Sequence, residues 1–197
     1  MAASGHAPRW GGAGLRALGR AILRVLGWRA VGDLPDVPKM VIIVAPHSSN
    51  WDFIVGIAYM MSRNVAVRFI GKRELFRWPL GVVMRHLGGI AVDRANPQAV
   101  VEQVVGEFAR VPGIVLGITP EGTRTRGATW KTGYYRIAKD AGVPIVPGFI
   151  DWTTKQVGVL PPFLPTGDQA GDLAHLRALY AGFGRADDPK PARQAGR

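Results

Sequence analysis

The chain reads MVIIVAPHSSNWDFIVGIAYMMS from residue 40 to residue 62, and this stretch predicts a strand followed by a helix. Its first six residues are apolar and mostly β-branched, which is typical of a buried strand. From Asp52 onward, the length and composition indicate a helix that an acidic residue opens. The polar loop that contains His47 therefore follows the carboxyl end of a buried strand.

The alternation of strands and helices continues along the chain. Apolar runs predict further strands over residues 65–70, 89–92, 113–118, 143–150 and 157–160, the last of which can pair with 143–150. Helices are expected over residues 52–62, 79–87, 97–110, 131–141 and 172–183, with Asn96 as the N-cap of the third. The sequence thus predicts the α/β class, a single domain with a mixed, largely parallel sheet flanked by helices. Ligands of such sheets bind beyond the carboxyl ends of strands, here in the loops after Ala45, Ile70, Val92 and Ile118.

Composition narrows the range of functions. The 197 residues are about enough for one domain, and a hydrophobic content of 47% supports a packed core. The sequence has no cysteine, which excludes disulfides, a thiolate nucleophile and cysteine-based metal sites. Its net charge of +11 favours an anionic partner: nucleic acid, acidic lipid head groups or a phosphorylated substrate. No apolar stretch reaches the roughly 18–20 residues of a membrane-spanning helix.

The N-terminal region predicts an amphipathic helix over residues 15–29. Arg16, Arg20 and Arg24 form a row along one face, where like charges repel unless something anionic lies opposite. A helix in a membrane interface would explain this row, and a helix packed on its own domain with a solvated arginine face is the alternative. Its apolar face would carry Leu15, Leu18, Ile22, Val25 and Leu26. We therefore expect an N-terminal flexible segment and interface helix at 1–34, a main domain at 35–184 and a disordered tail at 185–197.

His47 and Asp52 lie five residues apart, at the end of a strand and the start of a helix. A loop of this length can bring the carboxylate back to the imidazole Nδ1–H, which leaves Nε2 able to take a proton. Such a pair can act as a general base for a hydroxyl or amine nucleophile. The alternative is that Asp52 only caps its helix while His47 forms local hydrogen bonds.

A second polar loop, residues 119–126, reads TPEGTRTR after an apolar strand. Arginine side chains match phosphate oxygens, and a glycine allows backbone N–H groups to approach an anion. Lys72 and Arg94 follow neighbouring strands and could add positive charge to the same pocket. Taken singly, each of these residues could also be an ordinary surface charge.

The segment from His47 to Asp52, HSSNWD, resembles the H-x4-D motif of the glycerolipid acyltransferases, the family of 1-acylglycerol-3-phosphate acyltransferases. Three further blocks resemble that family in the same order. They are FIGKREL at 69–75 with Pro79, Gly81 and GGIAVDR at 88–94, then PEGTR at 120–124, then VPIVP at 143–147, with Lys131 and Gly133 between the last two. The resemblance covers about residues 40–150.

The resemblance implies transfer of an acyl group from a thioester, acyl-CoA or acyl carrier protein, to a hydroxyl of a glycerolipid. By position it implies that His47 is the general base and that Asp52 orients it. The implied acceptor phosphate site consists of Glu121, Gly122, Thr123 and Arg124, assisted by Arg94 and Lys72. Pro144 would lie on the acyl-donor side. The resemblance implies no metal and no cofactor besides the thioester co-substrate.

We therefore expect an O-acyltransferase of phospholipid biosynthesis that is peripheral on the cytoplasmic side of a membrane. Its partners would be the acyl thioester donor, a lysolipid acceptor such as 1-acylglycerol-3-phosphate and an anionic membrane surface, without nucleic acid. One alternative is a thioester or lipid hydrolase that uses the same His–Asp pair on water. Another is a basic nucleic-acid-binding domain, which the charge and six tryptophans suggest but which would leave the His–Asp pair without a role.

Overall fold

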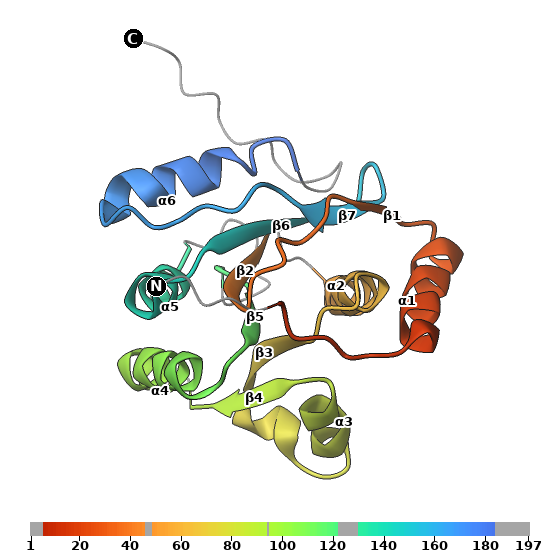
Figure 1. Cartoon of the computed structure of the whole chain (residues 1–197), viewed down its shortest axis with the longest axis horizontal. Helices are drawn as coiled ribbons and strands as arrows, with labels where there is room; N and C mark the ends of the chain where they lie inside the picture. Colours follow the sequence, from red (N-terminus) through yellow and green to blue (C-terminus); the bar gives the residue numbers. More distant parts are fainter. Residues whose placement is uncertain (1–5, 46–48, 94, 122–129, 184–197) are drawn as a thin grey trace.

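The computed structural model describes residues 6–45, 49–93, 95–121 and 130–183. Its centre is a seven-stranded sheet with the order β1-β7-β6-β2-β5-β3-β4, covered by helices on both faces (Figure 1). The strands are β1 (Arg29–Val31), β2 (Lys39–Ala45), β3 (Val67–Lys72), β4 (Gly89–Val92), β5 (Ile114–Ile118), β6 (Ile145–Asp151) and β7 (Gln156–Val159). The helices are α1 (Ala13–Val25), α2 (Asn50–Ser62), the 3-10 turn η1 (Arg73–Phe76), α3 (Leu80–His86), α4 (Pro97–Arg110), α5 (Gly133–Ala141) and α6 (Gln169–Ala178).

Strand direction confirms the predicted class of a mixed, largely parallel sheet. Strands β6, β2, β5, β3 and β4 are mutually parallel, β7 is antiparallel to β6, and β1 is parallel to β7. The carboxyl ends of five strands therefore meet at one edge of the sheet. Helices α4, α5 and α6 cover one face, and α1, α2 and α3 lie on the other (Figure 1).

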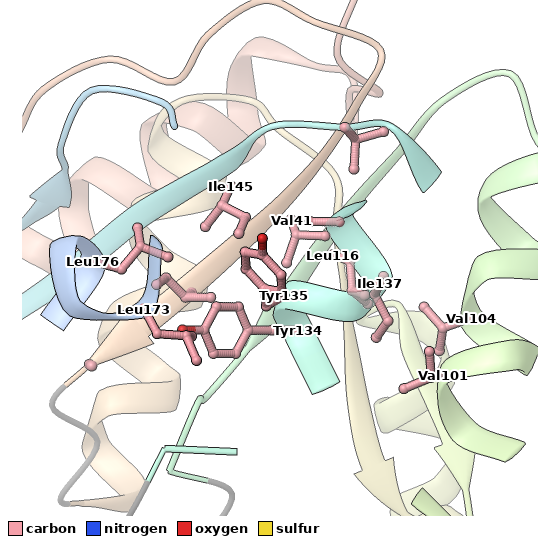
Figure 2. Packing of buried hydrophobic residues seen from close by; sticks show 14 of the residues in the cluster. Val41, Val101, Val104, Leu116, Tyr134, Tyr135, Ile137, Ile145, Leu173 and Leu176 are labelled. Atoms are coloured by element: carbon pink, nitrogen blue, oxygen red, sulfur yellow. The ribbon is translucent and has the colours of Figure 1, made fainter. Parts of the chain in front are cut away.

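Strand β2 lies in the middle of the sheet and is apolar on both faces because both are covered. Val41 pairs with Leu116 of β5 and with Ile145 of β6. In Figure 2, Tyr135 of α5 lies against Val41 and Ile145, and Tyr134 lies toward α6. Residues of α5 and α6 thus pack with β2, β5 and β6 into one hydrophobic core on this face of the sheet.

Helix α6 is attached to this core through a buried carboxylate. Asp172, 5% exposed, accepts hydrogen bonds from the Tyr135 hydroxyl and from the backbone N–H and Oγ1 of Thr166, each at 2.8 Å. Burial alone would raise the pKa of Asp172. The hydrogen bonds from Thr166 and Tyr135 outweigh burial and hold that pKa below its usual range. The carboxylate thus joins α5, α6 and the preceding loop.

The N-terminal region differs from the prediction at its end. The helix α1 stops at Val25, and residues 29–31 form strand β1 on the outer side of β7. The chain leaves the helix through Gly27, whose φ of 73° is a left-handed conformation that favours glycine. The expected domain boundary after residue 34 would therefore separate β1 from the sheet in which it pairs with β7. The predicted tail at 185–197 lies outside the described residues.

Helix α1 packs on α2 at close range. A Cβ on Gly19 would lie 2.6 Å from the Ser62 nitrogen, so only glycine allows the two backbones to approach this closely. Leu23 is also buried here, whereas Arg16, Arg20 and Arg24 are exposed. This is the arrangement of a helix packed on its own domain with its arginine row outward. No described helix is both long and apolar enough for a bilayer crossing.

Candidate active site

The candidate site lies at the sheet edge where the five parallel strands end. Asp52, Lys72 and Glu121 follow or end β2, β3 and β5 and are brought to this edge. Five predicted members of the site lie outside the described residues: His47, Arg94, Gly122, Thr123 and Arg124. The described geometry of the site is therefore that of Asp52 and its surroundings, with Lys72 at the end of β3 and Glu121 after the end of β5.

Asp52 is a buried carboxylate, 2% exposed, in the first turn of α2. Its Oδ2 accepts the Ser49 backbone N–H at 2.7 Å, and its Oδ1 accepts the Trp152 Nε1–H at 2.7 Å. Ser49 and Asp52 together form a capping box, so the carboxylate does cap its helix. Each carboxylate oxygen can accept two hydrogen bonds, so capping and orienting an imidazole are compatible roles.

The donor Trp152 was not among the predicted site residues. It follows β6, at the same sheet edge, in a turn that Asp151 stabilises by accepting the Thr153 N–H at 3.0 Å and the Thr154 hydroxyl at 2.5 Å. The ring of Trp28 contacts the Trp152 ring edge-on, with 5.0 Å between centroids. The signal that could have revealed Trp152 is its place after the strand predicted at 143–150, whose carboxyl end meets the same edge.

A groove adjoins Trp152 on the side of α1 and α2. Its volume is about 290 Å³, and it is lined by Leu26, Trp28, Trp51, Val55, Trp152 and Lys155. The ammonium of Lys155 lies 4.3 Å from the centroid of Trp152 and 5.1 Å from that of Trp28, within cation–π range. The groove therefore combines apolar aromatic walls with one positive charge beside the residue that holds Asp52.

The segment after β5, which is predicted to bind the acceptor phosphate, is closed at its base. The Lys131 N–H donates to the carbonyl of Pro120 at 2.8 Å, which joins the two ends of the segment that carries the predicted phosphate site. Glu121 is half-buried at the start of this segment. Lys72 is exposed at the end of β3, which pairs directly with β5. A phosphate held by this loop would therefore lie within the same edge as Lys72.

The structure does not bring Pro144 together with these residues. Pro144 precedes β6, and its carbonyl accepts the Val41 N–H at 3.0 Å near the start of β2. At a rise of about 3.3 Å per residue, the length of β6 places it roughly 20 Å from the edge where Asp52 lies. Its role on the acyl-donor side stays a prediction that rests on the resemblance. Within the described parts of the chain, no group of three or more potential metal ligands gathers.

Comparisons with known proteins agree with this architecture. The chain is 31% identical over 161 residues to a 1-acyl-sn-glycerol-3-phosphate acyltransferase of Salmonella typhimurium, which covers 70% of this chain and 64% of that relative. A relative of the same name from Escherichia coli is 30% identical over 125 residues, covering 60% and 49%. The chain thus spans less than two thirds of the length of these curated relatives.

A solved structure shares the fold. The 1-acyl-sn-glycerophosphate (LPA) acyltransferase PlsC of Thermotoga maritima superposes with a TM-score of 0.60 at 18% identity, covering 87% of this chain and 80% of that one. The family model described as Acyltransferase matches residues 30–151, which include strands β2 to β6 and the site edge. This chain therefore belongs to the Acyltransferase family.

Proposed function

We propose that this protein transfers a fatty acyl group from a thioester to the hydroxyl of a lysophospholipid such as 1-acylglycerol-3-phosphate, in phospholipid synthesis. Family membership and the names of the relatives support acyl transfer to this class of acceptor. The observation that carries the proposal is the Asp52 carboxylate, buried at the start of α2 and held by two donors, five residues after His47. A buried carboxylate held in this way is suited to orient an imidazole.

In the proposed reaction, Asp52 accepts the Nδ1–H of His47, which leaves Nε2 free of a proton. Nε2 removes the proton of the acceptor hydroxyl as the oxygen attacks the thioester carbonyl. The tetrahedral intermediate then collapses, the carbon–sulfur bond breaks, and the thiolate takes the proton from the imidazolium. Atoms and charges balance without an acyl-enzyme, a metal or any cofactor besides acyl-CoA or acyl carrier protein.

The acceptor phosphate is proposed to bind at the loop after β5. Glu121, Gly122, Thr123 and Arg124 would form the site, with Arg94 and Lys72 adding positive charge. Position supports this assignment, because Lys72 and Glu121 end or follow adjacent strands at the edge where Asp52 lies. Arginine would pair with phosphate oxygens in a bidentate manner. The closed base of the loop, from Pro120 to Lys131, would keep these groups in place.

We also propose that the protein works as a peripheral enzyme on the anionic cytoplasmic face of a membrane, without nucleic acid. The net charge of +11 and the outward arginine row of α1 support this placement. Leu18 and Val25, 51% and 85% exposed, leave some apolar surface beside that row. Most of the remaining apolar side of α1 is covered by α2.

The deciding experiment is mass spectrometry of products from a panel of lysolipids, with acyl-CoA and acyl carrier protein supplied as separate donors. We expect a diacyl product with at least one donor, and no product from His47→Ala at unchanged thermal stability. Arg124→Ala should raise the KM for the acceptor and leave that for the thioester unchanged. Full activity of His47→Ala would refute the assigned base. Release of free fatty acid regardless of acceptor would instead identify a hydrolase.

A further inference from the structure

The segment from η1 to α3 exposes an unusual number of large apolar side chains. Phe76 is its one buried large apolar residue. The exposed ones, which we call the η1–α3 surface, are Leu75 at 42%, Trp78 at 85%, Leu80 at 47%, Val82 at 58% and Val83 at 51%. A cluster of this kind on a folded domain marks an interaction surface.

The segment is firmly attached to the sheet without these side chains. The Phe76 ring lies over Gly71 of β3 and Gly89 of β4, where an added Cβ would come within 2.8 Å of it. Arg85 donates to the Phe76 carbonyl at 3.1 Å. Because Phe76 provides the attachment, the outward residues are not required to hold the segment in place.

The charges around the surface indicate its occupant. Arg73, Arg77 and Arg85 are exposed on the same short segment, against Glu74 as its one acidic residue. A tryptophan with aliphatic neighbours and flanking arginines is typical of a segment that lies in the head-group region of an anionic bilayer. Binding of a second protein would bury the apolar side chains, whereas an anionic lipid surface would contact both the apolar side chains and the arginines.

The position of this surface in the fold supports the same occupant. Among the described residues, nine of the ten large hydrophobic side chains that are exposed belong to α1, α2 and the η1–α3 segment, and the tenth is Leu164. These helices share one side of the sheet (Figure 1). The turn η1 begins directly after Lys72, at the edge of the candidate site. Docking here would bring that edge to the bilayer.

We propose that the η1–α3 surface docks the protein on an anionic lipid bilayer, with Trp78 and Val83 inserted among the acyl chains and Arg77 at the head groups. The inference deepens the proposed function, on which its biological purpose rests, by assigning bilayer contact to a segment other than α1. The binding itself requires no substrate and no catalysis.

The test is flotation of the full-length protein with vesicles of phosphatidylcholine alone or mixed with an equal part of phosphatidylglycerol. We expect wild type to bind the mixed vesicles, and the double variant Trp78→Ser/Val83→Ser to bind them roughly tenfold or more weakly, because the loss of apolar contact is large. Arg77→Glu should lower the preference for phosphatidylglycerol by about tenfold. Leu164→Ser, at an apolar position outside this segment that is 63% exposed, is the matched control and should bind like wild type.

Three outcomes would overturn the docking proposal: wild-type affinity of the double variant, an equal loss with Leu164→Ser, or a loss confined to a Leu18→Ser/Val25→Ser variant of α1. If the wild-type protein were a dimer, and the double variant a monomer that still binds vesicles, the surface would be assigned to contact with a second copy instead. All replaced side chains are exposed, so thermal unfolding should stay unchanged. Since flotation contains no substrate, an inactive enzyme that still floats contradicts the proposed function and leaves the docking surface standing.

Discussion

The indole nitrogen of Trp152 donates a hydrogen bond to Oδ1 of Asp52 at 2.7 Å across 100 residues of sequence. A hydrogen bond to a buried carboxylate both stabilises its charge and fixes its orientation. Trp152 itself is held by the turn that Asp151 stabilises and by edge contact with Trp28. The carboxylate of the proposed His–Asp pair is therefore aimed by a residue that lies just beyond residues 30–151, the region that the family model matches.

Replacing Trp152 with phenylalanine tests this positioning role. The variant keeps an aromatic ring and loses the donor, so we expect kcat to fall roughly tenfold to a hundredfold, the range of a hydrogen bond to a charged group. The KM values of donor and acceptor should change little, because neither substrate is proposed to bind the indole N–H. Steady-state kinetics measure kcat and KM separately, and Trp10→Phe, at a tryptophan near the opposite end of α2, is the control. A change in KM alone would assign Trp152 to substrate binding.

Asp52 and Ser49 separate the capping role from the catalytic one. Asp52→Asn should lower kcat roughly 10³-fold or more, because an amide cannot hold the imidazolium or fix its tautomer in the same way. Ser49→Ala removes the hydroxyl that accepts the Trp51 N–H at 3.2 Å and should cost about 1 kcal/mol of stability. Its backbone N–H still reaches Asp52, so its effect on kcat should be far smaller. Equal effects of the two variants on kcat would show that Asp52 acts only as a cap.

The lowered pKa of Asp172 makes stability depend on pH. A carboxyl whose pKa is lower in the folded state contributes stability above its unfolded pKa of about 3.9 and loses it as pH falls through the folded value. Asp172→Asn should lower the free energy of unfolding by about 1–3 kcal/mol at neutral pH. The gap should narrow as pH falls below the unfolded pKa of about 3.9. Urea unfolding at several pH values measures the free energy of unfolding of each variant. The control is Asp140→Asn, at an exposed aspartate on α5, which should change neither the free energy of unfolding nor its pH dependence.

Two glycines of α1 should respond oppositely to alanine. At Gly19 a Cβ would meet the α2 backbone at 2.6 Å, so Gly19→Ala should push the helices apart and lower stability by about 1–3 kcal/mol. At Gly14 nothing lies within 4 Å of the added Cβ, so Gly14→Ala should raise stability by up to about 1 kcal/mol through helix propensity. Thermal unfolding measures the Tm of both variants, which should fall for Gly19→Ala and rise for Gly14→Ala. Equal Tm shifts would contradict the close packing of α1 on α2.

The sequence predicted the parallel strands well because apolar β-branched runs such as residues 40–45 have few alternatives to a covered strand. It failed at residues 29–31, where helical spacing continued past Gly27 but the chain turned to pair with β7. Asp52 was predicted as a member of the candidate site because His47, its proposed partner, lies only five residues before it in the sequence. Trp152 was missed because its contact depends on which strand neighbours β2. Pro144 lies at the opposite edge because it comes directly before β6, which runs parallel to β2.

The outer strand β1 begins at residue 29, yet its partner is β7, which ends at Val159. Helix α1 can meet α2 while the chain is still short, but β1 has no edge to join until β6 has paired with β2 and β7 has folded back on it. During synthesis, β1 thus leaves the ribosome before the other six strands of this sheet, yet it can pair only after β7 has formed. Because β1 is only three residues long, it offers few backbone hydrogen-bonding groups for pairing with other nascent chains before β7 forms.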